Sequence, residues 1–201
     1  MSHKEFIDKD RPVEADYYQL MDQADSMEVE DFIKALEGLM KEDPYFLDTH
    51  LFMVEILNEN DEPKKARKLL NEIYDRAIEL ITDEEGNWPE KLPWGFMENR
   101  HIIRTLFNKA VVLWDQKKTN EALDLLRKLL KTNPNDNIGA RHYVLAIRLG
   151  MSFRKFENRF DRGGYYDSEV NTWFDQNSRK FPEEFGWWFD LMDKQNESGE
   201  W

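Results

Sequence analysis

Apolar residues recur three and four positions apart along two neighbouring stretches in the second half of the chain. Leu106, Ala110 and Leu113 follow this spacing in the first stretch, and residues 122–130 follow it in the second. This period gathers the apolar side chains on one side of an α-helix. The segment 115–120 between the two stretches is short and polar, which favours a tight turn. The pattern therefore predicts two amphipathic helices folded back on each other as a hairpin.

The same helical hairpin recurs with a period of about 34 residues, which indicates an array of repeated units. The clearest copy covers residues 103–136, where Asn133-Pro134 ends the second helix. Further copies fit residues 47–80 and 13–46. A fourth unit fits residues 137–162, although its second helix carries phenylalanines where small residues are expected. An array of helix pairs predicts an all-α fold.

Two segments fall outside the repeated pattern. Residues 81–102 carry Pro89, Pro93 and two glycines, residue types that break helices, so we expect an insertion that forms a loop on one face of the array. After Gly163-Gly164, interpreted as a hinge or a helix stop, residues 163–194 are rich in aromatic side chains and predict two further helices. We expect this end to be a cap over the last repeat, with an exposed aromatic contact patch as the alternative.

Three features of the clearest repeat match the pattern of a known repeat family. Ala110 occupies the small position of the first helix, Glu121-Ala122 is an acidic–small pair that opens the second helix, and Asn133-Pro134-Asn135 closes the unit. In these positions the chain resembles the tetratricopeptide repeat (TPR) family. The segments 94–100 and 133–137 also resemble a bacterial subset of that family and the related suppression-of-tumorigenicity-7 group.

The resemblance implies a single TPR-like domain over residues 1–201, built as a right-handed α-solenoid of antiparallel helix pairs with an aromatic-rich helical C-terminal cap. In such an array the first helix of each unit lines a concave groove where partners bind. The groove positions of the second unit form an acidic wall that includes Asp48, Leu51 and Glu55. The residues that we expect to contact a partner come from the third and fourth units: Arg104, Phe107, Asn108, Val111, Trp114, Arg141, Leu145 and Arg148.

Arginine and tryptophan carry much of the binding energy in protein interfaces, so the arginines of this set are the first candidates for partner contacts. Charge reversal at Arg104 and Arg141 is expected to abolish partner capture without changing stability. For Trp114 the alternative to partner binding is packing between the repeats.

The groove lacks the residues of the TPR clamp that holds chaperone C-terminal tails. By the resemblance, that clamp needs lysines, asparagines and an arginine at set positions. Only Asn108 matches, while Leu51, Glu55, Ile138 and His142 replace the other residues. We therefore expect an unidentified protein or peptide as the partner, and not a chaperone tail.

The net charge of -13 argues against nucleic acid as a partner, because binding to phosphates depends on clustered lysines and arginines. The chain contains no cysteine, which removes thiolate chemistry and fits a reducing compartment. No apolar stretch approaches the length of a membrane span. These features predict a soluble, cytoplasmic protein without membrane or nucleic-acid partners.

The residues that could carry chemistry form no pattern typical of an active site. His3, His50, His101 and His142 are far apart in sequence, and none has a second ligand at metal-binding spacing. The sequence predicts no catalytic, metal-binding or cofactor-binding residues and no cofactor. The resulting hypothesis is a non-enzymatic adaptor or scaffold that binds a protein or peptide. A self-associating structural protein is the alternative, followed by an enzyme or cofactor binder.

Overall fold

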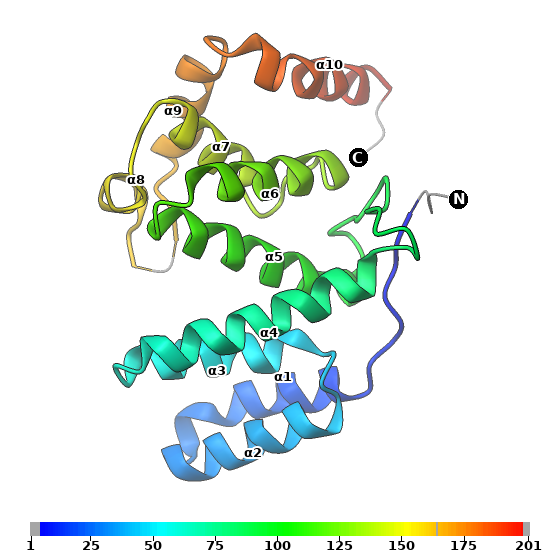
Figure 1. The fold of residues 1–201 in the computed structure, drawn as a ribbon, viewed down its shortest axis with the longest axis vertical. Helices are drawn as coiled ribbons and strands as arrows, with labels where there is room; N and C mark the ends of the chain where they lie inside the picture. Colours follow the sequence, from blue (N-terminus) through cyan, green and yellow to red (C-terminus); the bar gives the residue numbers. More distant parts are fainter. Residues whose placement is uncertain (1–4, 164, 199–201) are drawn as a thin grey trace. The chain divides into compact units, whose positions relative to one another are not determined.

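The computed structural model describes residues 5–163 and 165–198, and Figure 1 shows them as a ribbon coloured along the sequence. This part of the chain contains ten α-helices, a short 3-10 turn at Ala24–Ser26 and no β-strand, which confirms the all-α prediction. The helices are α1 (Val13–Gln23), α2 (Val29–Glu42), α3 (Leu47–Glu59), α4 (Pro63–Ile81), α5 (Met97–Asp115), α6 (Thr119–Thr132), α7 (Ala140–Arg148), α8 (Phe153–Phe160), α9 (Glu169–Ser178) and α10 (Pro182–Ser198).

The described residues divide into two compact units. Unit 1 comprises the residues up to Ala110 together with Lys131–Asn133, and unit 2 comprises Val111–Leu130 and the residues from Pro134 onward. The boundary falls within α5 and α6, so each of these helices contributes to both units. The single repeat domain over residues 1–201 stays a prediction.

In unit 1, α3 and α4 pack against each other across a tight turn. Asp61 adopts a left-handed conformation with φ of 57°, and the Glu62 N–H donates to the Leu57 carbonyl oxygen at 2.8 Å. Pro63 then opens α4, where its missing N–H costs nothing because the first turn of a helix leaves its N–H groups unbonded. The buried face of α4 repeats every three or four residues: Ala66, Leu70, Ile73, Ala77 and Ile81.

The stretch from Ala15 to Ala24, whose apolar pattern is weak, falls within α1 and the 3-10 turn that follows it. It packs against α2, and α2 packs against α3. The three helices share a core because each presents apolar side chains at helical spacing. The buried members of this core are Val13, Tyr17, Leu20, Phe32, Leu36, Phe46 and Met53.

The insertion is shorter than the predicted range of residues 81–102. Residues 82–96 are not helical, but α5 begins at Met97, inside the predicted insertion. The reason is a tertiary contact around Asn99, which is fully buried. Its side chain accepts a hydrogen bond from the Asp8 N–H at 3.0 Å and donates to the carbonyl oxygens of Phe6 and Pro93. The first turn of α5 is thus held by the N-terminal segment and by the loop before it.

In unit 2, α7 begins at Ala140, three residues after the start of the fourth unit predicted over residues 137–162. Gly139 has φ of 76° and Asp136 has φ of 50°, so the chain turns sharply before the helix starts. The Asp136 carboxylate accepts hydrogen bonds from the N–H groups of Ala140, at 2.7 Å, and Arg141, at 3.1 Å. Asp136 therefore caps α7 across a glycine turn that the apolar periodicity does not reveal.

The aromatic-rich end folds into α9 and α10, in agreement with the two further helices predicted within residues 163–194. α9 packs against α7. Several aromatic side chains from residue 153 onward form the core of unit 2, including Phe156, Phe160, Phe174 and Phe185, which are each at most 2% exposed. Tyr165 and Tyr166 are exposed, at 67% and 37%. Gly163 has φ of 81°, consistent with a helix stop, and Gly164 lies outside the described residues.

Candidate functional site

A pocket of about 330 Å³ lies in unit 1 where α1, α3 and α5 each present one face. We call it the tyrosine pocket. It combines aromatic rings, carboxylates, an amide and a guanidinium. Its lining consists of Tyr17, Tyr18 and Met21 from α1, Asp48, Leu51, Phe52 and Glu55 from α3, and Arg104 and Asn108 from α5.

The spacing of these residues explains why they meet. Residues three, four or seven positions apart lie on the same side of a helix. Tyr17 and Met21 are four apart on α1, and Arg104 and Asn108 are four apart on α5. On α3 the lining positions run from 48 through 51 and 52 to 55. Each helix therefore turns one continuous stripe toward the pocket.

Arg104 is held in place by two contacts inside unit 1. Its guanidinium pairs with the carboxylate of Asp48 and lies 5.4 Å from the centre of the Trp94 ring. Asp48 is 5% exposed, and its burial raises the pKa of the carboxyl while the charge of Arg104 opposes that rise. The positive charge of Arg104 is therefore neutralised by Asp48 within unit 1.

Tyr17 has a nearly buried side chain with an uncommitted hydroxyl. It is 8% exposed, and its ring packs edge-on against Tyr18 and Phe46 at centroid distances of 5.4 and 5.6 Å. No described residue hydrogen-bonds to its hydroxyl. Burial, followed by the negative charges of Asp48 and Glu55, raises the pKa of Tyr17, so the hydroxyl stays protonated at neutral pH.

Two further polar groups of the pocket have free acceptor atoms. Glu55 is exposed, and desolvation, with smaller contributions from Glu59 and Asp48, raises the pKa of its carboxyl. The Asn108 amide nitrogen donates to the Arg104 carbonyl oxygen at 3.0 Å. This contact leaves the amide oxygen of Asn108 without a donor among the described residues. The pocket therefore offers hydrogen-bond acceptors that no described side chain uses.

The tyrosine pocket brings together part of the predicted groove. Arg104 and Asn108 belong to the predicted partner-contact set, and Asp48, Leu51 and Glu55 belong to the predicted acidic wall. Phe107 and Val111 are half-buried on α5 and do not line this pocket.

Sequence reasoning missed the aromatic side of the pocket. Tyr17, Tyr18 and Met21 lie on a helix whose apolar pattern is weak, and Phe52 was assigned no role. The available signal was the adjacent tyrosine pair followed by Met21, which puts two large side chains four residues apart on one helix face.

The predicted groove residues of unit 2 are engaged in packing. Trp114 is 4% exposed and packs edge-on against Tyr143 and Phe153, at 5.9 and 5.6 Å between ring centres. Leu145 is fully buried. These positions support the alternative role for Trp114, namely packing between helices, and leave neither side chain accessible to a partner.

Arg141 and Arg148 likewise form ion pairs within unit 2. Arg141 pairs with the buried Asp136 at 2.8 Å and lies 5.5 Å from the rings of both Phe174 and Trp188. Arg148 pairs with Glu183 on α10. Charge reversal at Arg104 or Arg141 is therefore expected to lower stability, contrary to the expectation from the sequence, because each reversal would set two carboxylates against each other.

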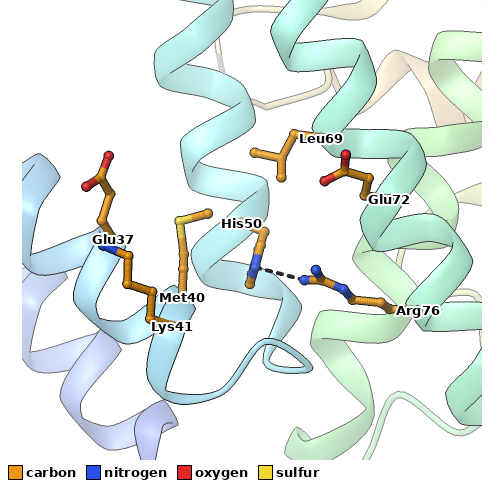
Figure 2. Close-up of a pocket in the computed structure, with 7 residues that line it drawn as sticks. All are labelled: Glu37, Met40, Lys41, His50, Leu69, Glu72 and Arg76. Carbon is orange, nitrogen blue, oxygen red and sulfur yellow. Dashed lines mark hydrogen bonds between the residues drawn. The ribbon is translucent and has the colours of Figure 1, made fainter.

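A second pocket of about 430 Å³ lies between α2, α3 and α4, as Figure 2 shows. Arg76 donates to Nε2 of His50 at 3.1 Å, so the ring proton is on Nδ1, which lies 3.0 Å from the Thr49 hydroxyl. Burial, followed by the charge of Arg76, lowers the pKa of His50 to about 4. Both ring nitrogens are engaged, and the carboxylates of Glu37 and Glu72 balance the nearby cations. The histidine of this pocket therefore has no free ring nitrogen.

A buried histidine–aspartate pair joins the N-terminal segment to α5. The Leu47 N–H donates to Nδ1 of His101 at 3.2 Å, so Nε2 carries the proton and donates to Asp8 at 3.0 Å. Burial tends to raise the pKa of Asp8, but hydrogen bonds from His101 and Arg11 outweigh it and hold that pKa below its usual value. Arg11 also pairs with Asp43 at 2.7 Å. All these contacts lie within unit 1, so the network holds Asp8 and Arg11 of the N-terminal segment against the rest of unit 1.

In the described part of the chain, no three or more His, Asp or Glu side chains gather as a metal site would require. No described helix is long and apolar enough to cross a membrane.

Comparison with known proteins identifies no relative. A scan against protein-family models and searches of curated proteins and of solved structures found no match. The resemblance to TPR proteins therefore rests on the residues that carry it.

Proposed function

We propose that the protein is a non-enzymatic adaptor that binds a segment of another protein in the tyrosine pocket. The observation that carries the proposal is one pocket whose aromatic walls enclose polar groups without partners in the described chain. A volume of about 330 Å³ lies at the lower end of the range for ligand pockets and suits one large side chain with its adjoining backbone.

The location of the pocket agrees with the TPR resemblance. Its walls come from α1, α3 and α5, which are the first helices of the units predicted over residues 13–46, 47–80 and 103–136. First helices are the elements that the resemblance assigns to partner binding. We propose a right-handed α-solenoid of TPR-like helix pairs as the arrangement in which the pocket forms part of a concave groove.

The described histidines favour binding over catalysis. An acid–base catalyst needs a titrating group within reach of a substrate. His50 accepts from Arg76, and His101 is enclosed between Leu47 and Asp8. Neither of these two rings has a nitrogen free for proton transfer. The third described histidine, His142, has no hydrogen-bond partner for its Nε2 among the described residues, but that side chain is buried in unit 2 and only 7% exposed. None of the three therefore presents a free nitrogen to a substrate, which supports a non-enzymatic role.

The proposal is tested by filling the pocket. Asn108 is exposed at the pocket wall, so Asn108→Trp adds a bulky ring with little effect on the core. Peptides selected from a random phage library on the wild-type protein should lose about tenfold or more in affinity for this variant, as expected when a buried interface contact is blocked. Asn196→Trp, at an exposed position of α10, is the matched control and should bind normally. Equal binding of the selected peptides to all three proteins would show that the pocket is not the binding site.

A further inference from the structure

We infer that the tyrosine pocket receives a basic side chain, lysine or arginine, from the bound segment. This inference rests on the proposed adaptor function and specifies the chemistry of the partner. It follows from the charge, the hydrogen-bonding groups and the aromatic walls of the pocket.

The charge of the pocket is negative once its internal ion pair is counted. Of the charged residues that line it, Arg104 and Asp48 neutralise each other, and Glu55 has no cationic partner. Two further carboxylates lie close enough to add to the negative field: Glu59 interacts electrostatically with Glu55, and Glu14 interacts with Asp48. An incoming cation meets an attractive field here, while an incoming carboxylate is repelled.

The hydrogen-bonding groups lead to the same chemistry. The hydroxyl of Tyr17 belongs to a side chain that is 8% exposed and has no partner among the described residues. The amide oxygen of Asn108 and the carboxylate of Glu55 are acceptors. An ammonium or guanidinium group carries several donors and no acceptor, so it can donate hydrogen bonds to all three of these oxygen-bearing groups at once. An apolar side chain would leave the Tyr17 hydroxyl buried and unpaired.

The walls suit the remainder of a basic side chain. Tyr18, at 36% exposure, and the half-buried Phe52 provide aromatic surface next to the polar groups. Lysine and arginine have long apolar stems that pack on such surface, and their charged ends are attracted to aromatic rings. The pocket thus matches both parts of a basic side chain.

The experiment uses an array of short peptides whose central residue is Arg, Lys, Gln, Leu or Glu within randomised uncharged flanks. Wild-type protein should prefer central Arg or Lys by about tenfold, the difference expected of a charge-assisted hydrogen bond. Glu55→Gln should remove most of this preference, and Glu55→Lys should shift it toward central Glu. Tyr17→Phe, which keeps the ring, should weaken binding of the basic peptides several-fold.

The matched control is Glu30→Gln, which removes the same charge from an exposed position on α2. An equal loss with Glu30→Gln would mean that the whole acidic protein attracts basic peptides, and it would overturn the inference. Peptides that depend on the pocket, as judged with Asn108→Trp, but show no preference for Arg or Lys would overturn the inference and leave the adaptor proposal intact. If no peptide binds through the pocket, both proposals fail.

Discussion

Two nearly buried tyrosines have different surroundings in the two units. In unit 2, Tyr143 is 3% exposed and its hydroxyl pairs with the hydroxyl of Tyr166, which in turn donates to Glu157 at 2.6 Å. In unit 1, Tyr17 is 8% exposed and its hydroxyl has no partner among the described residues. A paired hydroxyl contributes to a closed core, whereas the Tyr17 oxygen keeps contact with solvent and is open to a ligand. The comparison indicates that aromatic residues form a closed core in unit 2 and an open site in unit 1.

The largest expected effect concerns the aromatic side chains themselves. Phe156 is fully buried and packs against Trp114, Phe160 and Trp173. Phe156→Ala should lower the free energy of unfolding by about 3–5 kcal/mol because it leaves a cavity. Tyr18→Ala in the tyrosine pocket should cost less than about 1 kcal/mol because that side chain is partly exposed. Urea unfolding followed by circular dichroism measures both, and equal losses would show that the pocket is a packed core.

The second prediction compares acid sensitivity, since each unit buries a neutral histidine. Burial lowers the pKa of His50 to about 4 and that of His142 to about 3, while an unfolded histidine titrates near 6.5. Their stabilising effect is therefore complete above about pH 6.5 and is lost as the pH falls toward 4, because the unfolded chain binds protons first. His50 should account for up to about 3 kcal/mol of this loss. The charged groups that influence it are Arg76, Asp43 and Glu72.

Unfolding free energies measured between pH 7 and pH 4 test this prediction. The His50→Gln variant should show a shallower decline than the wild type, because one titrating group has been removed. An identical pH profile for the two proteins would contradict the neutral, buried state of His50.

The third prediction compares arginines. Arg104→Met should cost about 2 kcal/mol, because Asp48 would remain buried without its cation. Arg148→Met should cost less than about 1 kcal/mol, since its partner Glu183 is exposed and Glu184 keeps its pair with Arg127. Thermal and urea unfolding of the two variants would reveal the difference. A larger loss for Arg148→Met would reverse the assignment of the more important ion pair.

The smallest effect concerns two glycines. Gly139, before α7, has φ of 76°, and an added Cβ would lie 3.2 Å from Nδ1 of His142. Gly139→Ala should therefore cost about 1 kcal/mol. Gly95, in the loop before α5, has open space around it, so Gly95→Ala should change stability by less than about 0.5 kcal/mol. The two melting temperatures provide the check, and equal shifts would argue against the left-handed turn.

The helices themselves were largely predictable from the apolar period. The hairpin of α3 and α4 and the hairpin of α5 and α6 both have buried apolar residues at helical spacing, such as Leu70, Ile73 and Ala110. The starts of α5 and α7 were not predictable. The first depends on contacts of Asn99 with distant residues, and the second depends on the turn at Gly139. The local spacing of apolar residues does not predict such long-range contacts.

The candidate site was likewise predictable only in part from the sequence. The sequence indicated that Arg104 and Asn108 share one face of a helix, because that follows from a spacing of four. The sequence did not indicate that Arg104 forms an ion pair with Asp48, 56 positions away. Nor did it indicate that the Arg141 guanidinium lies near the aromatic rings of Phe174 on α9 and Trp188 on α10. Pairing between distant charges depends on how helices pack, and packing sums many weak contacts that no local pattern encodes.

The amino-acid order alone therefore established an all-α chain, its helix pairs and its acidic character, since these depend on local spacing and composition. Which polar groups remain without partners depended on the folded chain. Tyr17 became a candidate ligand-binding residue, and Trp114 became a core residue, through neighbours that come from other helices. Burial and pairing are properties of the assembled helices, and for this reason the tyrosine pocket emerged only from the three-dimensional arrangement.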